Sequence, residues 1–426
     1  MQPESAIPPV ISEWQRAALT PVAPTERIET LDALRGFALL GILAVNMTLF
    51  SWPVYEVFVT GRDWTLWHDR LADWAVRFLA EGKFYLLFSF LFGLGMAIQM
   101  ERAEARGAAF AGRFSRRLTV LLGIGLLHAF VLWEGDILVW YAAFGFLLLA
   151  FRKCKPGTLL VWAGVFLLIP VAVYTLIWAM VAVGSLVPEG AKAIQQEFAR
   201  AEQYYAQVAQ ENLRVFAQGT VAEIFAQRAR NVLFLWSYTW FFAPNFFAMF
   251  LLGLYAGKRR LLHDVAAHIG LFRRLLVWGL CLGLPGNLIY TIGFEFANQS
   301  EVSLTWVIAM GAYAVGGPAL CFAYAAGITL LLRRANWERC LRPLASAGRM
   351  ALSNYLLQSL VCTTIFYSYG LGWYGSVGRA AGLGLVMLIF AAQLPLSVWW
   401  LKHFRFGPAE WGWRSLTYGK LQPMRG

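Results

Sequence analysis

Long apolar segments recur along this chain and are separated by shorter segments rich in polar and basic residues. A run of about 18 or more apolar residues is long enough to cross a bilayer as a helix. Backbone N–H and C=O groups in lipid must be satisfied within the segment, so helices are the structure that fits such runs. The pattern predicts about ten spanning helices, near residues 31–50, 71–100, 117–134, 136–151, 158–186, 231–257, 273–296, 304–333, 345–369 and 379–401.

The composition supports an all-α, polytopic bundle of membrane helices. Of the 426 residues, 59% are hydrophobic and 14% are charged, whereas soluble domains contain about 25% charged residues. The 19 Trp and 16 Tyr residues suit the two membrane–water interfaces, where amphipathic rings settle. The five scattered cysteines form no CxxC motif, so we predict neither a metal site nor a disulfide framework.

The net charge of +12 has two explanations, nucleic-acid binding or membrane orientation. Lys and Arg fall mainly in short segments between the predicted helices, a distribution typical of cytoplasmic loops. With ten spans, all of these basic clusters lie on one side together with both termini, whereas an odd number of spans would divide them. We therefore predict that both termini are cytoplasmic and that nucleic acid is not a partner.

This topology divides the chain into five parts. We expect a cytoplasmic tail at 1–30, an N-terminal transmembrane half with the site at 31–187, an extracytoplasmic segment at 188–230, a C-terminal transmembrane half at 231–401 and a cytoplasmic tail at 402–426. The extracytoplasmic segment mixes acids, bases and Ala at helical spacing. It predicts one or two amphipathic helices that cap a site, and a solvated connector is the alternative.

Polar residues inside apolar runs are costly and are therefore candidates for function. The first span carries Asp32 and Arg35 at its cytoplasmic end and Asn46 about three turns further out. Asp32 and Arg35 either pair on one helix face or leave the Arg35 guanidinium to bind phosphate. Lys83 and Ser89 in the second run are candidate binding residues; alternatively, the lysine snorkels to the interface and the serine bonds its own helix backbone.

The stretch LLHAFVLWEGDILVWYAAFG, residues 126–145, holds three titratable side chains in one apolar hairpin. Glu134 either is solvated in the turn or belongs to the site, and Asp136 either caps the following helix or orients a base. His128 lies one to two turns deep, where a neutral imidazole beside a carboxylate would serve as a general base. His68, near the outer surface, is the second candidate for the base.

The ninth span, GRMALSNYLLQSLVC, brings three further polar candidates into the bundle: Arg349, Asn354 and Gln358. Asn354 and Gln358 are four residues apart and share a helix face. Such amides either join neighbouring helices or line a polar cavity. The chain contains no Walker phosphate loop, HExxH, GxSxG or dinucleotide-binding fingerprint, so neither an ATP-driven pump nor a soluble-type hydrolase is expected.

Several of these stretches resemble the YeiB-like bacterial membrane proteins, which carry a domain of unknown function, DUF418, in their C-terminal half. The resemblance implies a multi-pass protein of the bacterial inner membrane. The N-terminal half is more distantly similar to heparan-α-glucosaminide N-acetyltransferase, which shares a D-x-x-R-G-x-A opening with an Asn at the position of Asn46. The stretches that match the YeiB-like family, in the same order along the chain, are RIETLDALRGFALLGILAVNM, EGKFYLLFSFLFGLG, RRLTVLLGIGLLHAFVLWEGDILVWYA, GRMALSNYLLQS and FGPAEWGWRSLTY.

This distant similarity implies a membrane acyltransferase that takes an acyl group from cytosolic acyl-CoA or acetyl-CoA, without a metal. Arg35 and the loop arginines would hold the CoA phosphates, and His128 or His68, oriented by Asp136 or Asp63, would activate the acceptor. Many relatives carry His where this chain has Asn, eleven residues after the first-span Arg, so the base must come from elsewhere.

In this reading Asn46, Asn354 and Gln358 line the passage and stabilise a developing oxyanion. The expected partners are membrane lipids and a glycan or lipid-linked acceptor with a hydroxyl or amine group, and a homodimer is left open. A transporter or exporter of a small or lipid-linked solute is the alternative, since broken helices and amides inside the membrane fit it as well.

Overall fold

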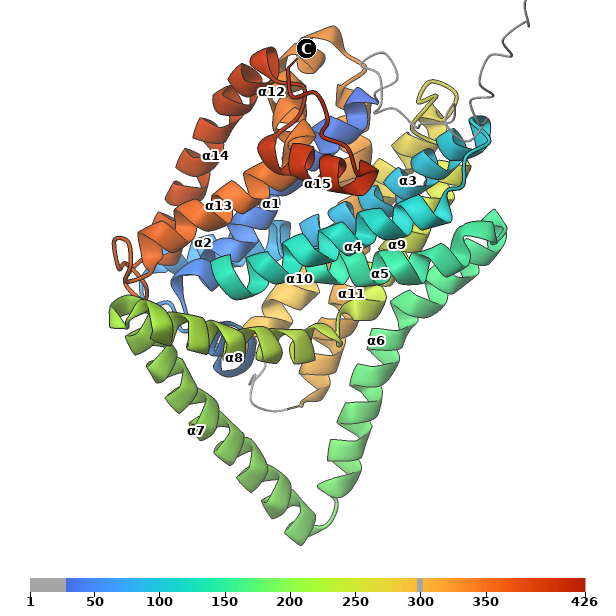
Figure 1. The fold of residues 1–426 in the computed structure, drawn as a ribbon. Helices are drawn as coiled ribbons and strands as arrows, with labels where there is room; N and C mark the ends of the chain where they lie inside the picture. Colours follow the sequence, from blue (N-terminus) through green and yellow to red (C-terminus); the bar gives the residue numbers. More distant parts are fainter. Residues whose placement is uncertain (1–27, 297–301, 426) are drawn as a thin grey trace, which may run out of the picture.

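The computed structural model describes residues 28–296 and 302–425, which form a bundle of helices (Figure 1). The N-terminal half contains α1 (Glu29–Ser51), η3 (Glu56–Thr60), α2 (Trp67–Leu79), α3 (Phe84–Ala105), α4 (Ala111–Leu127), η4 (His128–Leu132), α5 (Leu138–Ala150), η5 (Phe151–Lys153) and α6 (Pro156–Gly184). The rest contains α7 (Pro188–Gln218), α8 (Val221–Thr239), α9 (Ala243–Lys258), α10 (Ile269–Phe296), α11 (Leu304–Leu331), α12 (Ala335–Arg349), α13 (Ala351–Phe366), α14 (Arg379–His403) and α15 (Pro408–Tyr418). No strand occurs within these two ranges.

The prediction of an all-α polytopic membrane protein is confirmed, although fewer than ten of its helices are long and apolar enough to be candidate spans by themselves. In the described ranges, seven helices are long and apolar enough to cross a membrane, or eight if α8 and α9, which meet at a bend of 68°, count as one span. The remaining two predicted spans correspond to α5, with 13 residues, and α13, with 16. Crossing the hydrocarbon core takes about 20 helical residues, so neither helix is long enough alone.

The segment predicted as one or two amphipathic helices contains α7 and α8. Helix α7 has 31 residues and meets α6 in a V whose apex points away from the bundle (Figure 1). Helix α8 begins with a capping box, in which the Thr220 hydroxyl and the Glu223 carboxylate bond each other's backbone N–H groups. It continues to Thr239 and therefore passes the expected boundary at residue 230. Because α8 contacts η4, it connects this segment to the hairpin that contains His128.

Small residues allow two pairs of helices to approach closely. Gly93 of α3 faces α9 where Gly253 lies, and Gly36 of α1 faces α12 where Gly348 lies. A Cβ atom on any of these four glycines would collide with a main-chain oxygen of the facing helix. Helices in membranes use small residues in this way, because backbone contact takes the place of hydrophobic attraction.

We expect Gly253→Ala to destabilise the bundle, because the added methyl group meets the Phe90 carbonyl oxygen, part of a rigid backbone. Overpacking of this kind costs about 1–3 kcal/mol. The measurement is the thermal unfolding midpoint of the purified protein in detergent. Gly164→Ala on α6 is the control, because its added methyl group meets open space and alanine favours helix. Equal midpoints for the two variants would contradict a close α3–α9 contact.

Candidate functional site

His128 lies where α4 changes its helical winding. The regular helix ends at Leu127, and residues 128–132 form one wider turn, η4, closed by the Trp133 N–H donating to the His128 carbonyl at 2.8 Å. Single turns of this kind inside α-helices occur frequently at functional sites. The wider turn allows the hairpin to bring Asp136 back beside His128.

His128 uses its two ring nitrogens to connect its own hairpin to α13. Nδ1 lies 2.7 Å from Oδ2 of Asp136, and Nε2 lies 2.9 Å from the hydroxyl oxygen of Ser359 on α13. The other Asp136 oxygen accepts the Val139 N–H at 2.8 Å. The carboxylate can only accept, so Nδ1 carries the proton and Nε2 is left to accept the Ser359 hydroxyl. Asp136 therefore both caps the following helix and holds the His128 ring, so it combines the contacts that the two alternatives from the sequence require.

The His128–Asp136 pair is enclosed by protein rather than by a wet chamber. The side chains of His128 and Asp136 are 1% and 0% exposed, and Ser359 is fully buried as well. Polar groups in such an interior are stable when they bond one another. The mutual hydrogen bonds therefore allow these polar side chains to be buried.

Glu134 is also buried, contrary to the solvated alternative. Its two carboxylate oxygens accept the Asn231 amide and the Tyr367 hydroxyl, each at 3.0 Å. Nε of Arg228, a fully buried side chain, lies 3.7 Å from the same carboxylate, and Asn212 bonds Asn231. This network joins the hairpin to α7, α8 and the end of α13. Glu134 therefore has a structural role, as the anion that balances a buried arginine.

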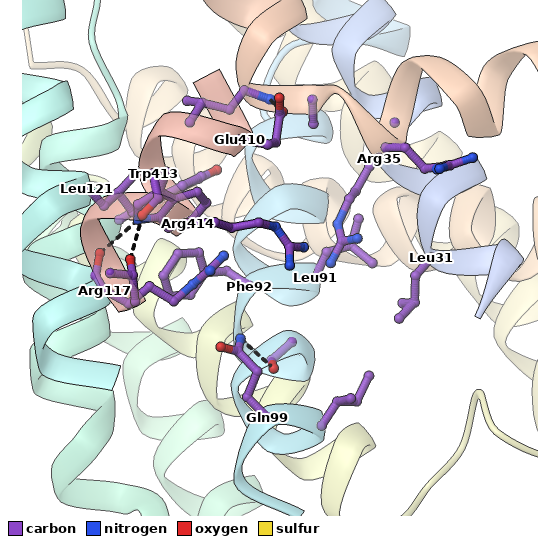
Figure 2. A pocket seen from close by; sticks show the side chains of 18 of the residues that line it. Leu31, Arg35, Leu91, Phe92, Gln99, Arg117, Leu121, Glu410, Trp413 and Arg414 are labelled. Atoms are coloured by element: carbon purple, nitrogen blue, oxygen red, sulfur yellow. Dashed lines mark hydrogen bonds between the residues drawn. The ribbon is translucent and has the colours of Figure 1, made fainter. Parts of the chain in front are cut away.

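A cavity of about 380 Å³ opens at the end of the bundle that carries the basic segments between helices. Its lining includes eight arginines but only two carboxylates, those of Asp32 and Glu410. Figure 2 shows the side chains of Arg35, Arg117 and Arg414 reaching toward the same space from three helices. The arginines are Arg35, Arg102, Arg106, Arg113, Arg117, Arg349, Arg405 and Arg414.

The inner part of this cavity is apolar. Its lining on α3 extends from Arg102 to Phe88, roughly 21 Å of helix at 1.5 Å per residue. The innermost lining includes Ile137, next to Asp136, and Tyr355, whose ring centroid is 4.9 Å from that of His128. The cavity therefore leads from a cationic mouth to the protein layer in front of the His128–Asp136 pair.

The cationic mouth is held by a few specific contacts. Arg35 pairs with Asp32 at 3.0 Å, as one of the two sequence interpretations expects, and it also lines the cavity. The Arg117 guanidinium lies 3.6 Å from the centre of the Trp413 ring, whose indole N–H donates to the Arg117 carbonyl. Nη1 of Arg113 is buried without a hydrogen-bond partner among the described residues. These groups provide a strongly cationic site for an anion.

The C-terminal helix α15 completes the cavity wall through Glu410. The Glu410 carboxylate accepts the Leu352 N–H at 2.7 Å and the Ser353 N–H at 3.1 Å, at the start of α13. Burial raises the pKa of the Glu410 carboxyl, and the hydrogen bonds from Ser353 and Leu352 oppose that rise. Glu410 thus caps the helix that carries Tyr355 and Ser359.

Two candidates lie apart from the His128 pair and outside the cavity lining. His68 is at the start of α2 with its side chain 47% exposed, and its nearest carboxylate is Asp69, at 4.0 Å, rather than Asp63. Asn46 is half-buried on α1. The structure therefore brings Asp136, but neither His68 nor Asn46, to His128.

Lys83 and Ser89 both bond backbone carbonyls. Lys83 is 0% exposed and its ammonium donates to the Arg77 carbonyl at 2.8 Å. It therefore does not snorkel, because the short bend between α2 and α3 points its side chain into the bundle. Ser89 donates to the Tyr85 carbonyl of its own helix at 2.8 Å, which agrees with the alternative in which this serine bonds its own helix backbone. Neither residue lines the arginine cavity.

The amides of α13 face α14. Asn354 donates to the Ser397 hydroxyl at 3.0 Å, and Gln358 donates to the Gln393 amide oxygen at 2.9 Å. These bonds favour the helix-joining alternative, since neither amide lines the cavity. Arg349 does line the cavity mouth.

Sequence reasoning missed three features of the site. Ser359 is not among the candidates chosen from the ninth span, although its spacing of four from Tyr355 places both on one helix face. Tyr355 itself carried no signal that separates it from other core tyrosines. Arg405 and Arg414 fall in the predicted cytoplasmic tail, 402–426, and only the folding of α15 against α4 brings this part of the chain to the cavity.

We expect Glu134→Leu to lower the free energy of unfolding by about 3–5 kcal/mol, because it leaves Arg228 as an uncompensated buried charge. The double variant Glu134→Leu/Arg228→Met should recover most of that loss. Thermal unfolding in detergent measures both. Arg200→Ala, which breaks an exposed pair with Glu197, is the control and should change stability by about 0–1 kcal/mol. A stable Glu134→Leu single variant would argue against a structural ion pair.

Comparison with known proteins places this geometry in a family. The family described as "Protein of unknown function (DUF418)" matches residues 256–420. The chain is 38% identical over 424 residues to "Uncharacterized protein YxaH" of Bacillus subtilis, covering 96% of this chain and 98% of the relative. It is 30% identical to "Uncharacterized 39.9 kDa protein in amylase 3'region" of Bacillus acidopullulyticus (95% and 98% covered) and 27% identical to "Uncharacterized protein YeiB" of Escherichia coli (93% and 98% covered). The chain therefore belongs to the YeiB-like family of membrane proteins that carry the DUF418 region.

Proposed function

We propose that this protein is a membrane acyltransferase that takes an acyl group from a cytosolic acyl-CoA thioester and passes it to a hydroxyl or amine acceptor. The acceptor would be extracytoplasmic or lipid-linked. One observation carries the proposal: a single cavity combines a mouth lined by eight arginines with an apolar inner part that ends beside the His128–Asp136 pair.

The mouth suits the phosphate groups of coenzyme A. Guanidinium groups bind phosphate oxygens through paired, charge-assisted hydrogen bonds, and they stay charged when partly buried. Arg113 is well placed for this role because part of its guanidinium is buried without a partner among the described residues. The acidic groups on the lining do not cancel this charge, since Asp32 pairs with Arg35 and Glu410 caps α13.

The apolar inner part suits the rest of the donor. A length of roughly 21 Å along α3 accommodates an extended pantetheine arm and the start of an acyl chain. His128, with Nδ1 held by Asp136, has the tautomer that a general base needs. The buried pair would act once the thioester reaches the inner end of the cavity at Tyr355.

The proposal implies that the arginine mouth faces the cytosol of a bacterial cell, with both termini on that side of the inner membrane. Basic segments between helices favour this orientation. Cys340 on α12 is exposed on the same end of the bundle as Arg349, a mouth residue of the same helix.

We expect Cys340 to react with a membrane-impermeant maleimide only after spheroplasts are permeabilised. The test uses a variant in which Cys154 and Cys281, the other two cysteines that are not buried, are replaced by Ser. A second variant adds Arg200→Cys on α7, which should react in intact spheroplasts. Labelling of Cys340 in intact spheroplasts would contradict the orientation.

We expect His128→Ala to abolish thioester turnover while CoA-ester binding persists, because His128 lies behind the inner end of the cavity. Arg113→Ala should raise the Kd for acyl-CoA by about 10–100-fold, the loss of one charge-assisted bond of about 1.5–3 kcal/mol. Purified protein in nanodiscs with acetyl-, octanoyl- or palmitoyl-CoA provides both measurements, with free thiol release as the turnover signal.

Arg273→Ala is the matched control for Arg113→Ala, because Arg273 is exposed on α10 outside the cavity lining. His68→Ala tests the competing base. Turnover that survives His128→Ala but not His68→Ala would move the catalytic role to His68. Failure of the unmodified protein to bind any of the three CoA esters would overturn the acyltransferase proposal.

The bend of 68° between α8 and α9 favours a second candidate, a transporter of an anionic amphiphile. Broken helices often flank the binding sites of transporters. In that case the arginines would bind an anionic headgroup, and His128→Ala would leave binding unchanged with no thioester turnover in any variant. The same assay therefore separates the two functions.

A further inference from the structure

We propose that Ser359 is a nucleophile that carries the acyl group as a covalent ester between donor and acceptor. This inference rests on the proposed acyl transfer and specifies its course. It is carried by the arrangement Asp136–His128–Ser359, in which successive polar atoms lie 2.7 and 2.9 Å apart.

The three side chains have the geometry of an activated nucleophile. A serine hydroxyl is a weak nucleophile unless an adjacent base accepts its proton and a third group orients that base. Nε2 of His128 accepts the Ser359 hydroxyl, and Asp136 holds the proton on Nδ1. The competing acceptor, the Tyr355 carbonyl, lies further away at 3.3 Å.

The position of Ser359 on α13 connects it to the cavity. Leu352 and Tyr355 line the cavity, and Ser359 follows Tyr355 by four residues, one turn further on the same helix face. On the opposite wall, Ile137 and Leu138 line the cavity directly after Asp136. Ser359 and Asp136 therefore both lie next to residues that line the inner end of the cavity.

The side chain of Tyr355 controls access to Ser359. Its ring packs against His128, and its hydroxyl lies 3.4 Å from the Gly135 carbonyl, a long hydrogen bond. A rotation of this ring would join the apolar cavity to the Ser359 hydroxyl without moving a helix. In this mechanism the arriving thioester displaces the Tyr355 ring and reaches Ser359. Without a thioester, the ring covers the three side chains.

In the first half-reaction, Ser359 Oγ attacks the thioester carbonyl carbon and forms a C–O bond while His128 Nε2 accepts the hydroxyl proton. The C–S bond then breaks, and His128 gives that proton to the departing sulfur. The products are an ester on Ser359 and free CoA thiol, so no oxidant or reductant is needed.

In the second half-reaction, the acceptor hydroxyl or amine attacks the ester carbonyl, and His128 Nε2 takes its proton. The C–O bond to Ser359 breaks, and the proton returns to Ser359 Oγ. The products are the acylated acceptor and the original enzyme.

Trp133 offers a hydrogen-bond donor for the oxyanion of both steps. Its indole N–H is buried without an acceptor among the described residues, and its ring lies 6.1 Å from that of His128. Stacking on Phe50 at 3.9 Å holds the indole in place. A preorganised donor beside the reacting carbonyl stabilises the developing negative charge.

Neighbouring serines lack this arrangement. Ser89 bonds its own helix, Ser353 bonds Glu410, and Ser397 accepts the Asn354 amide. None of these three has a hydrogen bond to histidine. Ser359 is therefore the serine that the His128 base can activate.

The test is intact-protein mass spectrometry of purified protein in nanodiscs, incubated with acetyl-, octanoyl- or palmitoyl-CoA without an acceptor. We expect the mass to increase by one acyl group, with the label on the peptide that contains Ser359. Ser359→Ala should lose the label and lower turnover by about 10³–10⁶-fold, as removal of a triad member does elsewhere. Its CoA-ester Kd should remain unchanged.

Two further variants keep the result interpretable. Ser359→Cys retains a nucleophile at the same place and should form a thioester that neutral hydroxylamine releases, whereas the Ser359 ester should resist it. Thr364→Ala removes an exposed hydroxyl on the same helix that bonds only the Leu360 carbonyl, and should leave label and turnover intact.

The outcomes separate this inference from the proposed function. Turnover that is lost in His128→Ala but retained in Ser359→Ala would overturn the covalent step and leave direct transfer to the acceptor. A label that maps to any residue other than Ser359 would also overturn it. Absence of both label and CoA-ester binding in the unmodified protein would overturn the acyltransferase itself.

Discussion

A side chain that leaves water for the interior of a membrane bundle is stable only beside a partner, and this requirement determines where the helices of the protein meet. His128 bonds Asp136 within its own hairpin and Ser359 on α13. Three positions after Trp133, the carboxylate of Asp136 also caps α5. The short helices α5 and α13 are thus held beside His128 by polar bonds.

The second buried network fixes the outer end of the same hairpin. Glu134 neutralises Arg228 and accepts hydrogen bonds from Asn231 and Tyr367, which belong to segments far apart in the sequence. Removing one partner of such a set is more costly than removing all of them, because the remaining charge has no water to replace it. The hairpin therefore contains one carboxylate that neutralises a buried arginine, Glu134, and one that holds the His128 imidazole, Asp136.

The arginines and the His128–Asp136 pair lie at opposite ends of the cavity. The arginines gather where the basic segments between helices and α15 meet, and the apolar lining of α3 separates them from the enclosed His128 pair. An anionic headgroup can be held at the mouth while the reactive group of the same molecule approaches a site from which water is excluded. Exclusion of water strengthens the hydrogen bonds among Asp136, His128 and Ser359, and in the proposed reaction it would limit hydrolysis of the acyl ester.

Apolar runs, basic segments and the polar residues within the hairpin are local properties of the chain, so the sequence alone determined the class of fold, the position of most helices and the choice of His128 and Asp136. Partners distant in sequence depend on how helices rotate and cross, which an apolar pattern in lipid does not specify. For that reason only the tertiary structure decided that α5 and α13 are short helices, that Lys83 points inward and that Asn354 and Gln358 join α14. It also placed Ser359, rather than Asn46, against the imidazole, because α13 packs its Tyr355 face on His128, whereas α1 meets the hairpin through Phe50 and Trp133.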